Sequence, residues 1–100
     1  DPYLVGVKAL HRPAYVSCES VLFDHGVVHQ PPREVTLVSD VSKHFSVGGG
    51  RYRSRKMTPA RLFDPSGIRT QNGARVASRA RALSDLRYFY PKKYLDDPSR

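Results

Sequence analysis

The sequence predicts an α+β fold: a small mixed or antiparallel sheet of about four or five short strands, with two main helices packed on one face. Three features indicate this class. Residues 34–39 are rich in β-branched side chains and alternate as strand residues do. Two further stretches alternate in the same way around glycine-containing turns. Residues 78–90 have the apolar spacing of an amphipathic helix.

The chain is expected to form one domain that begins with a short connector. Its 100 residues are enough for a single hydrophobic core. Residues 1–13 are predicted to be a connecting segment, either a short helix or an extended stretch, which Pro13 terminates. Residues 14–97 are predicted to form the core. Because the chain starts at Asp1 without a methionine, we expect it to be a fragment of a longer protein.

A helix and an internal strand are predicted next. The helix spans residues 17–25, with Ser17 as its N-cap and Gly26 as the left-handed residue that ends it. Cys18 is expected to be a small buried apolar residue. A Pro-Pro turn follows, and then the strand at residues 34–39, which we place inside the sheet because both of its sides are apolar at the centre.

Residues 48–56, GGGRYRSRK, predict one half of a hairpin with an arginine-bearing face. A two-residue turn at Gly48-Gly49 sets Phe45 and Tyr52 on one face and the arginines on the other. A three-residue turn would place the apolar side chains beside the arginines, so the two-residue turn is preferred. The expected pairs are Val47 with Gly50, Ser46 with Arg51 and Phe45 with Tyr52. The arginines on the opposite face are Arg51, Arg53 and Arg55.

The function of this hairpin has two open interpretations. A phosphate-cradling loop is disfavoured, because such a loop ends in Gly-Lys-Ser/Thr and leads into a helix, whereas RYRSRK alternates like a strand. The arginine face could contact nucleic-acid phosphates. Alternatively, the charges could belong to an edge strand and prevent aggregation.

A second hairpin and a C-terminal helix complete the predicted fold. Asn72-Gly73 lies between two short strand-like segments and favours a turn with positive φ at both positions. Before this hairpin, Leu62 and Phe63 are expected to fill the core. A helix is predicted over residues 78–90, with its first serine as N-cap. We expect its apolar side to hold Ala82, Leu83, Leu86, Phe89 and Tyr90, and its polar side to hold Arg81, Ser84, Asp85 and Arg87.

The charge balance favours a polyanionic partner. The chain has 17 Lys and Arg residues against 9 Asp and Glu residues, a net charge of +8. Cationic side chains that neutralise phosphates release condensed counterions, which drives binding to nucleic acid. We therefore expect contacts with the DNA phosphate backbone. The residues expected to make them are Arg51, Arg53, Arg55, Lys56, Arg81 and Arg87.

The sequence does not favour catalysis, a metal or a membrane. Cys18 is the single cysteine, so neither an internal disulfide nor a multi-cysteine zinc site is expected. His25 and His29 are four residues apart at a helix end, without the glutamate of a zinc-protease motif. No paired acids suit acid–base chemistry, which makes a nuclease fragment the least favoured interpretation. We expect a cytoplasmic protein without cofactor, metal or membrane contact.

Three segments, in order, are similar to the AbiEi-like antitoxins of type IV toxin–antitoxin systems. The first is PAYVSCESVLFDHGVV, the second is EVTLVSD with the basic hairpin after it, and the third is RVASRARALSDLRYFYP. The matching positions of the first segment are Tyr15, Ser17, Ser20, Leu22, His25 and Gly26. Those of the third segment are Val76, Ala77, Ser78, Ala82, Leu83 and Asp85.

The resemblance implies a non-enzymatic antitoxin-type domain of a bacterial transcriptional regulator. Such a domain would counteract a nucleotidyltransferase-like toxin and help to hold DNA during repression. The chain departs from the family pattern at Ala80 and Arg81, where the family usually has Glu-Lys before Ala-Leu. The family's N-terminal winged helix-turn-helix is also not among these residues. The alternative is a protein-interaction module that binds an acidic partner without DNA affinity.

Overall fold

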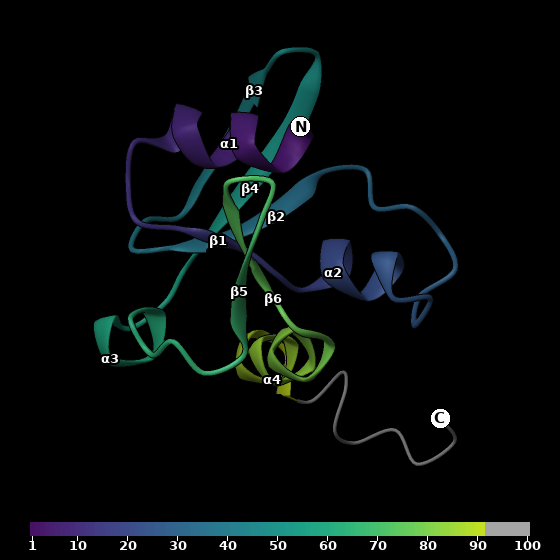
Figure 1. The fold of residues 1–100 in the computed structure, drawn as a ribbon, viewed down its shortest axis with the longest axis vertical. Helices are drawn as coiled ribbons and strands as arrows, with labels where there is room; N and C mark the ends of the chain where they lie inside the picture. Colours follow the sequence, from purple (N-terminus) through teal and green to yellow (C-terminus); the bar gives the residue numbers. More distant parts are fainter. Residues whose placement is uncertain (92–100) are drawn as a thin grey trace.

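The structure is a computed structural model that describes residues 1–91. It has the predicted α+β class, with six strands in one mixed sheet rather than four or five (Figure 1). The elements in order are α1 (Pro2–Leu10), β1 (Tyr15–Val16), α2 (Glu19–Asp24), β2 (Val35–Ser39), β3 (Lys43–Val47), β4 (Gly50–Lys56), α3 (Pro59–Leu62), β5 (Ile68–Gln71), β6 (Ala74–Ala77) and α4 (Arg79–Phe89). The last part of the predicted core, residues 92–97, lies outside the described residues.

The strand order is β3-β4-β2-β1-β6-β5. β2 is parallel to β4 and β1 is parallel to β6, whereas the remaining neighbours are antiparallel. The prediction that β2 is internal is confirmed, because it lies between β4 and β1. β1 contains only Tyr15 and Val16, both fully buried, and it joins the two halves of the sheet.

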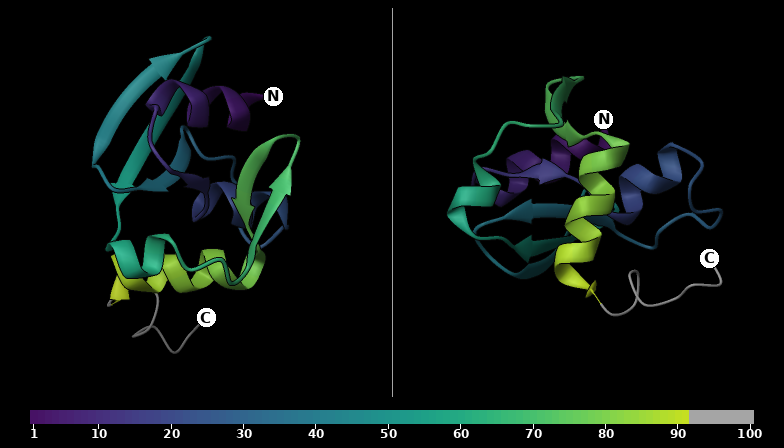
Figure 2. Two further views of the ribbon diagram at one scale, coloured as in Figure 1. Left: turned by 60° about the vertical axis from the view of Figure 1, so that its left-hand side comes forward. Right: turned by 90° about the horizontal axis from the view of Figure 1, so that it is seen from below.

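Helices cover both faces of the sheet, which corrects the expectation of a mere connector at the N-terminus. α1 and α4 lie on opposite sides of the sheet (Figure 2). Gly6 of α1 sits directly on the Tyr52 ring, and a Cβ there would lie 2.3 Å from Tyr52 Cε1. The Tyr52 hydroxyl donates a hydrogen bond of 2.7 Å to the carbonyl of Pro2. α1 is therefore an integral layer of the domain.

The start of α2 also differs from the prediction. The helix begins at Glu19, and Cys18 rather than Ser17 occupies the N-cap position, with φ 61°. Ser17 is fully buried, and its hydroxyl donates a 2.6 Å hydrogen bond to Asp85 Oδ2 instead of capping the helix. Gly26, with φ 74°, has the left-handed conformation expected after the helix.

The two hairpins have the predicted turns and register. β3 and β4 pair Phe45 with Tyr52, whose rings stack with centroids 5.2 Å apart. The other two expected pairs, Ser46 with Arg51 and Val47 with Gly50, are also present. Asn72 and Gly73 have φ of 52° and 85°, and both glycines of the first turn also have positive φ. These values are those of turns that follow the twist of a hairpin.

The connection between the hairpins and the last helix contains one correction. Leu62, in α3, is 1% exposed and fills the core as expected, but Phe63 is 58% exposed. Phe63 is the residue at which this single-turn helix ends, so its side chain leaves the buried face that Leu62 occupies. α4 starts as predicted, because the Ser78 hydroxyl accepts a 3.1 Å hydrogen bond from the Arg81 backbone N–H. Within residues 1–91, no helix is long and apolar enough to cross a bilayer.

Candidate functional site

The arginines of β4 project from one face of the strand, as the hairpin register requires. Arg51 is exposed, and Arg53 and Arg55 are half-buried. Tyr52, which lies between Arg51 and Arg53 in the sequence, is on the other face of the strand and is buried against α1. Lys56 lies at the exposed end of β4, at a position that alternates with Arg55. It therefore does not continue the arginine row.

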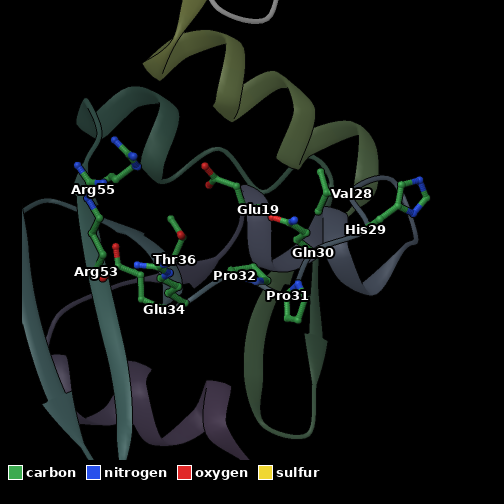
Figure 3. A pocket seen from close by; sticks show the side chains of 11 residues that line it. Glu19, Val28, His29, Gln30, Pro31, Pro32, Glu34, Thr36, Arg53 and Arg55 are labelled. Atoms are coloured by element: carbon green, nitrogen blue, oxygen red, sulfur yellow. The ribbon is translucent and has the colours of Figure 1, made fainter.

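Arg53 and Arg55 form one wall of a cleft of about 510 Å³ (Figure 3). The parallel pairing of β2 with β4 places Thr36 beside Arg53 at the base of this wall. Glu19, the first residue of α2, projects into the cleft from another side. The loop at residues 28–34 supplies the rest of the lining. The cleft thus contains cationic, anionic and apolar groups within one small volume.

The Arg55 guanidinium is held by aromatic rings rather than by carboxylates. Its Cζ lies 5.2 Å from the Phe89 ring centroid and 4.5 Å from the Tyr90 ring centroid, at the end of α4. Its Nε is buried and has no hydrogen-bond partner among residues 1–91. Burial, with the nearby charge of Arg53, lowers the pKa of Arg55. The rings therefore orient a guanidinium that has a donor without an acceptor in the described part of the chain.

Glu19 presents an unpaired acceptor in the same cleft. Its Oε1 is buried and has no hydrogen-bond partner within the described part of the chain. The second carboxylate of the lining, Glu34, lies 3.6 Å from His44 Nδ1. Among the ion pairs of the described residues, none joins Arg53 or Arg55 to a carboxylate. Glu19 and Glu34 lie close enough to attract the charge of Arg55, but no ion pair joins the arginines to either carboxylate within residues 1–91.

A second polar cluster lies in the interior and collects residues of the family motif. Asp85 is fully buried, and its Oδ2 accepts hydrogen bonds from the hydroxyls of Tyr15, at 2.9 Å, and Ser17, at 2.6 Å. Its Oδ1 lies 3.5 Å from Arg81 Nε and 3.4 Å from Arg61 Nη2. The prediction that Asp85 belongs to the polar outer side of α4 is wrong.

Arg81 is likewise buried rather than available to DNA. It is 8% exposed, and its guanidinium donates hydrogen bonds to the carbonyls of Asp64, Ser66 and Arg61, at 3.0, 2.6 and 2.7 Å. A further bond of 3.1 Å goes to the Tyr15 hydroxyl. The expectation that Arg81 contacts phosphates is therefore corrected. Of the other basic residues named for DNA contact, Arg87 is exposed on α4.

The remaining family-motif residues have separate local positions. The Ser20 hydroxyl accepts a 3.0 Å hydrogen bond from the Thr36 backbone N–H, which ties α2 to β2. Ser78 caps α4, and Leu83 is half-buried against the core. His25 lies exposed at the end of α2. Of the motif positions, only Tyr15, Ser17 and Asp85 converge on one point.

Cys18 combines strained backbone with a buried thiol. Its φ of 61° and ψ of −135° lie in a region that side chains other than glycine rarely adopt. The side chain is fully buried, and burial raises the pKa of the thiol to about 12. At neutral pH the thiol is protonated and shielded from solvent, which does not suit a nucleophile.

Within residues 1–91, no three side chains of the metal-ligating types gather as they would around an ion. Comparison of the chain with protein-family models, curated proteins and solved structures found no match.

Proposed function

We propose that this chain is a non-enzymatic, antitoxin-type domain of a bacterial transcriptional regulator that contacts DNA phosphates in the cytoplasm. The observation that carries the proposal is the row formed by Arg51, Arg53 and Arg55 on one face of β4. Alternate strand residues are about 6.8 Å apart, which corresponds to two phosphate steps of about 3.4 Å along the axis of one DNA strand. None of the three has a carboxylate partner within residues 1–91.

The proposal includes neutralisation of a nucleotidyltransferase-like toxin. It is supported by the resemblance to AbiEi-like antitoxins, whose motif is distributed over segments far apart in this chain. Tyr15 and Ser17 from the first segment meet Asp85 from the third in one buried network. The motif therefore has a physical basis as the interior of one domain, which leaves the surface of that domain free for partners.

The test is fluorescence anisotropy with a labelled DNA duplex at a series of salt concentrations. Replacing Arg51, Arg53 and Arg55 together by Ala should weaken binding and reduce the slope of log K against log salt by about 2.7, since each phosphate contact contributes about 0.9. The matched control replaces Arg69, Arg75 and Arg79 by Ala, which removes the same charge elsewhere. If both triple variants lost the same affinity and salt dependence, the net charge of the chain, rather than the arginine row, would account for DNA binding.

A protein partner with an acidic surface is the second candidate function. It is favoured by the exposure of two aromatic side chains, Phe63 at 58% and Tyr88 at 45%. Arg61 lies over the Tyr88 ring, with Cζ 5.3 Å from its centroid, and aromatic and arginine side chains are common in interface centres. Co-purification with the product of the neighbouring gene tests this function. A complex that duplex DNA does not displace would favour it over DNA contact.

A further inference from the structure

We propose that the cleft between β4 and α2 binds one unpaired nucleotide whose base carries an exocyclic amino group. The phosphate lies on Arg53 and Arg55, and the amino group donates to Glu19. The inference rests on the proposed function in one respect, since it assigns the same two arginines to phosphate. It goes further by giving the cleft a preference among bases.

The two arginines that line the cleft, Arg53 and Arg55, favour an anionic group in the ligand. Arg53 and Arg55 lie two residues apart on the same face of β4, and no carboxylate among residues 1–91 forms an ion pair with either. Arg55 is oriented by the Phe89 and Tyr90 rings, and its buried Nε lacks an acceptor among the described residues. A phosphate accepts several charge-assisted hydrogen bonds from such paired guanidinium groups and relieves their mutual repulsion.

Glu19 favours a hydrogen-bond donor in the same ligand. Its buried Oε1 has no hydrogen bond to any of the residues that the structure describes, and an unsatisfied buried acceptor is costly. A second phosphate would be repelled by this carboxylate, so the group opposite it must donate a hydrogen bond. A base amino group meets this need, because carboxylates accept hydrogen bonds from exocyclic amines such as cytosine N4.

The apolar part of the lining favours a nucleotide over a purely polar zwitterion. Val28, Pro31 and Pro32, from the loop after α2, contribute side chains to the cleft across from the arginines (Figure 3). These groups can pack against a flat base or a sugar, whereas free phosphate or an acidic amino acid offers little surface to them. The volume of about 510 Å³ lies within the usual range for small-molecule sites.

The same geometry disfavours uracil and thymine. Where cytosine has an amino group, these bases have a carbonyl oxygen, which would face the Glu19 carboxylate and be repelled. Their single ring N–H is flanked by two carbonyls, so it cannot approach Oε1 without bringing an oxygen close to the same carboxylate. A paired base is stacked inside the duplex and cannot lie in the cleft against Val28, Pro31 and Pro32. The nucleotide is therefore either free or in an unpaired strand.

Isothermal titration calorimetry with CMP and UMP tests the inference, because the two ligands share sugar and phosphate and differ only at the base edge, in the group at position 4 and the hydrogen on N3. The wild-type protein should bind CMP at least about tenfold more tightly than UMP, the factor expected for one hydrogen bond to a charged group. Glu19→Gln should bring the ratio close to one, because an amide can also donate to a carbonyl. Glu34→Gln removes the same charge from the cleft and should preserve the ratio. Thermal unfolding checks that both variants are folded.

Oligo(dC) and oligo(dT) distinguish the two sources of the nucleotide. A preference for oligo(dC) over both CMP and oligo(dT) identifies an unpaired strand, whereas equal affinity for CMP and oligo(dC) identifies a free nucleotide. Equal binding of CMP and UMP by the wild type, tighter binding of L-glutamate than of CMP, or a ratio unchanged by Glu19→Gln would overturn the inference. If duplex DNA binds but no mononucleotide does, the inference fails while the DNA proposal stands. If the protein binds CMP more tightly than UMP but does not bind duplex DNA, the DNA proposal fails and the nucleotide inference stands.

Discussion

Asp85 is the residue on which the interior of the molecule depends most directly. Its carboxylate is fully buried and lies within ion-pair distance of two arginines while it accepts two hydroxyl hydrogen bonds. Buried charges of this kind add little net stability when all partners are present, but removal of one partner leaves the others uncompensated. The cluster therefore makes the domain sensitive to single substitutions in its centre.

We predict that Asp85→Asn lowers the free energy of unfolding by about 3–5 kcal/mol, the usual effect of breaking a buried ion pair. The amide keeps the shape of the side chain, but it leaves the charge of Arg81, which is 8% exposed, without its partner. Urea unfolding followed by circular dichroism measures the effect. Asp64→Asn, at an exposed position, should cost much less, and a similar loss in both variants would contradict the assigned role of Asp85.

Cys18 gives a prediction about reactivity. Burial raises its thiol pKa to about 12, so the folded protein presents neither a thiolate nor an accessible sulfur at pH 8. A thiol-specific reagent such as a disulfide chromophore should react slowly with the native protein and rapidly after unfolding in denaturant. Because the folded pKa is raised above the ordinary value of 9.0, this thiol favours the folded state below pH 9 and loses that contribution as the pH rises toward 12. Fast labelling of native protein would contradict the burial of Cys18.

At the scale of elements, α1 provides the clearest test, because it forms a layer where only a connector was expected. Gly6→Ala should destabilise the domain by about 1–3 kcal/mol, the usual cost of overpacking, although alanine favours helix. The added Cβ would lie 2.3 Å from the Tyr52 ring, so α1 must shift away from the sheet. Thermal unfolding measures the loss. Lys8→Ala, on the exposed side of α1, is the control and should change stability little.

The hairpins were predictable from sequence because their information is local. Alternating residues fix the faces of β3 and β4, and turn residues that tolerate positive φ fix the register. β1 was missed because two residues carry no alternation. The start of α2 was misplaced because Ser17 has the chemistry of an N-cap, yet its hydroxyl is bound by Asp85, 68 residues further along the chain. Sequence pattern does not report such distant partners.

The same limit applies to the candidate site. The arginine row was predicted from alternation, but the cleft depends on the parallel pairing of β2 with β4 and on the position of α2. Nothing local in the sequence brings Glu19 opposite Arg55. Arg81 and Asp85 were assigned to the polar side of α4, although their four-residue spacing on a helix was a signal of an ion pair. That spacing alone does not say whether the pair is buried or exposed.

For the whole molecule, the C-terminal ends of α4 and β4 meet at the cleft. The two segments are more than 30 residues apart in sequence, yet the Phe89 ring lies 5.2 Å from Arg55 Cζ and limits the directions in which the guanidinium can point. Binding by Arg55 should therefore depend on a ring that touches no ligand. If binding relied only on the net charge of +8, loss of this ring would not change it. The dependence on Phe89 therefore tests whether the orientation of Arg55 contributes to binding.

We predict that Phe89→Leu weakens duplex binding about two- to fivefold, which corresponds to loss of one partly exposed cation–π contact. Leucine keeps apolar packing but has no ring face, so Arg55 regains freedom that must be lost again on binding. Tyr88→Leu is the matched control, because the neighbouring ring lies against Arg61 instead of Arg55. Anisotropy at one fixed salt concentration measures affinity, and thermal unfolding confirms that both variants are folded. Equal affinities of the two variants would mean that the Phe89 ring contributes nothing to binding, since the Tyr90 ring, 4.5 Å from Arg55 Cζ, is present in both.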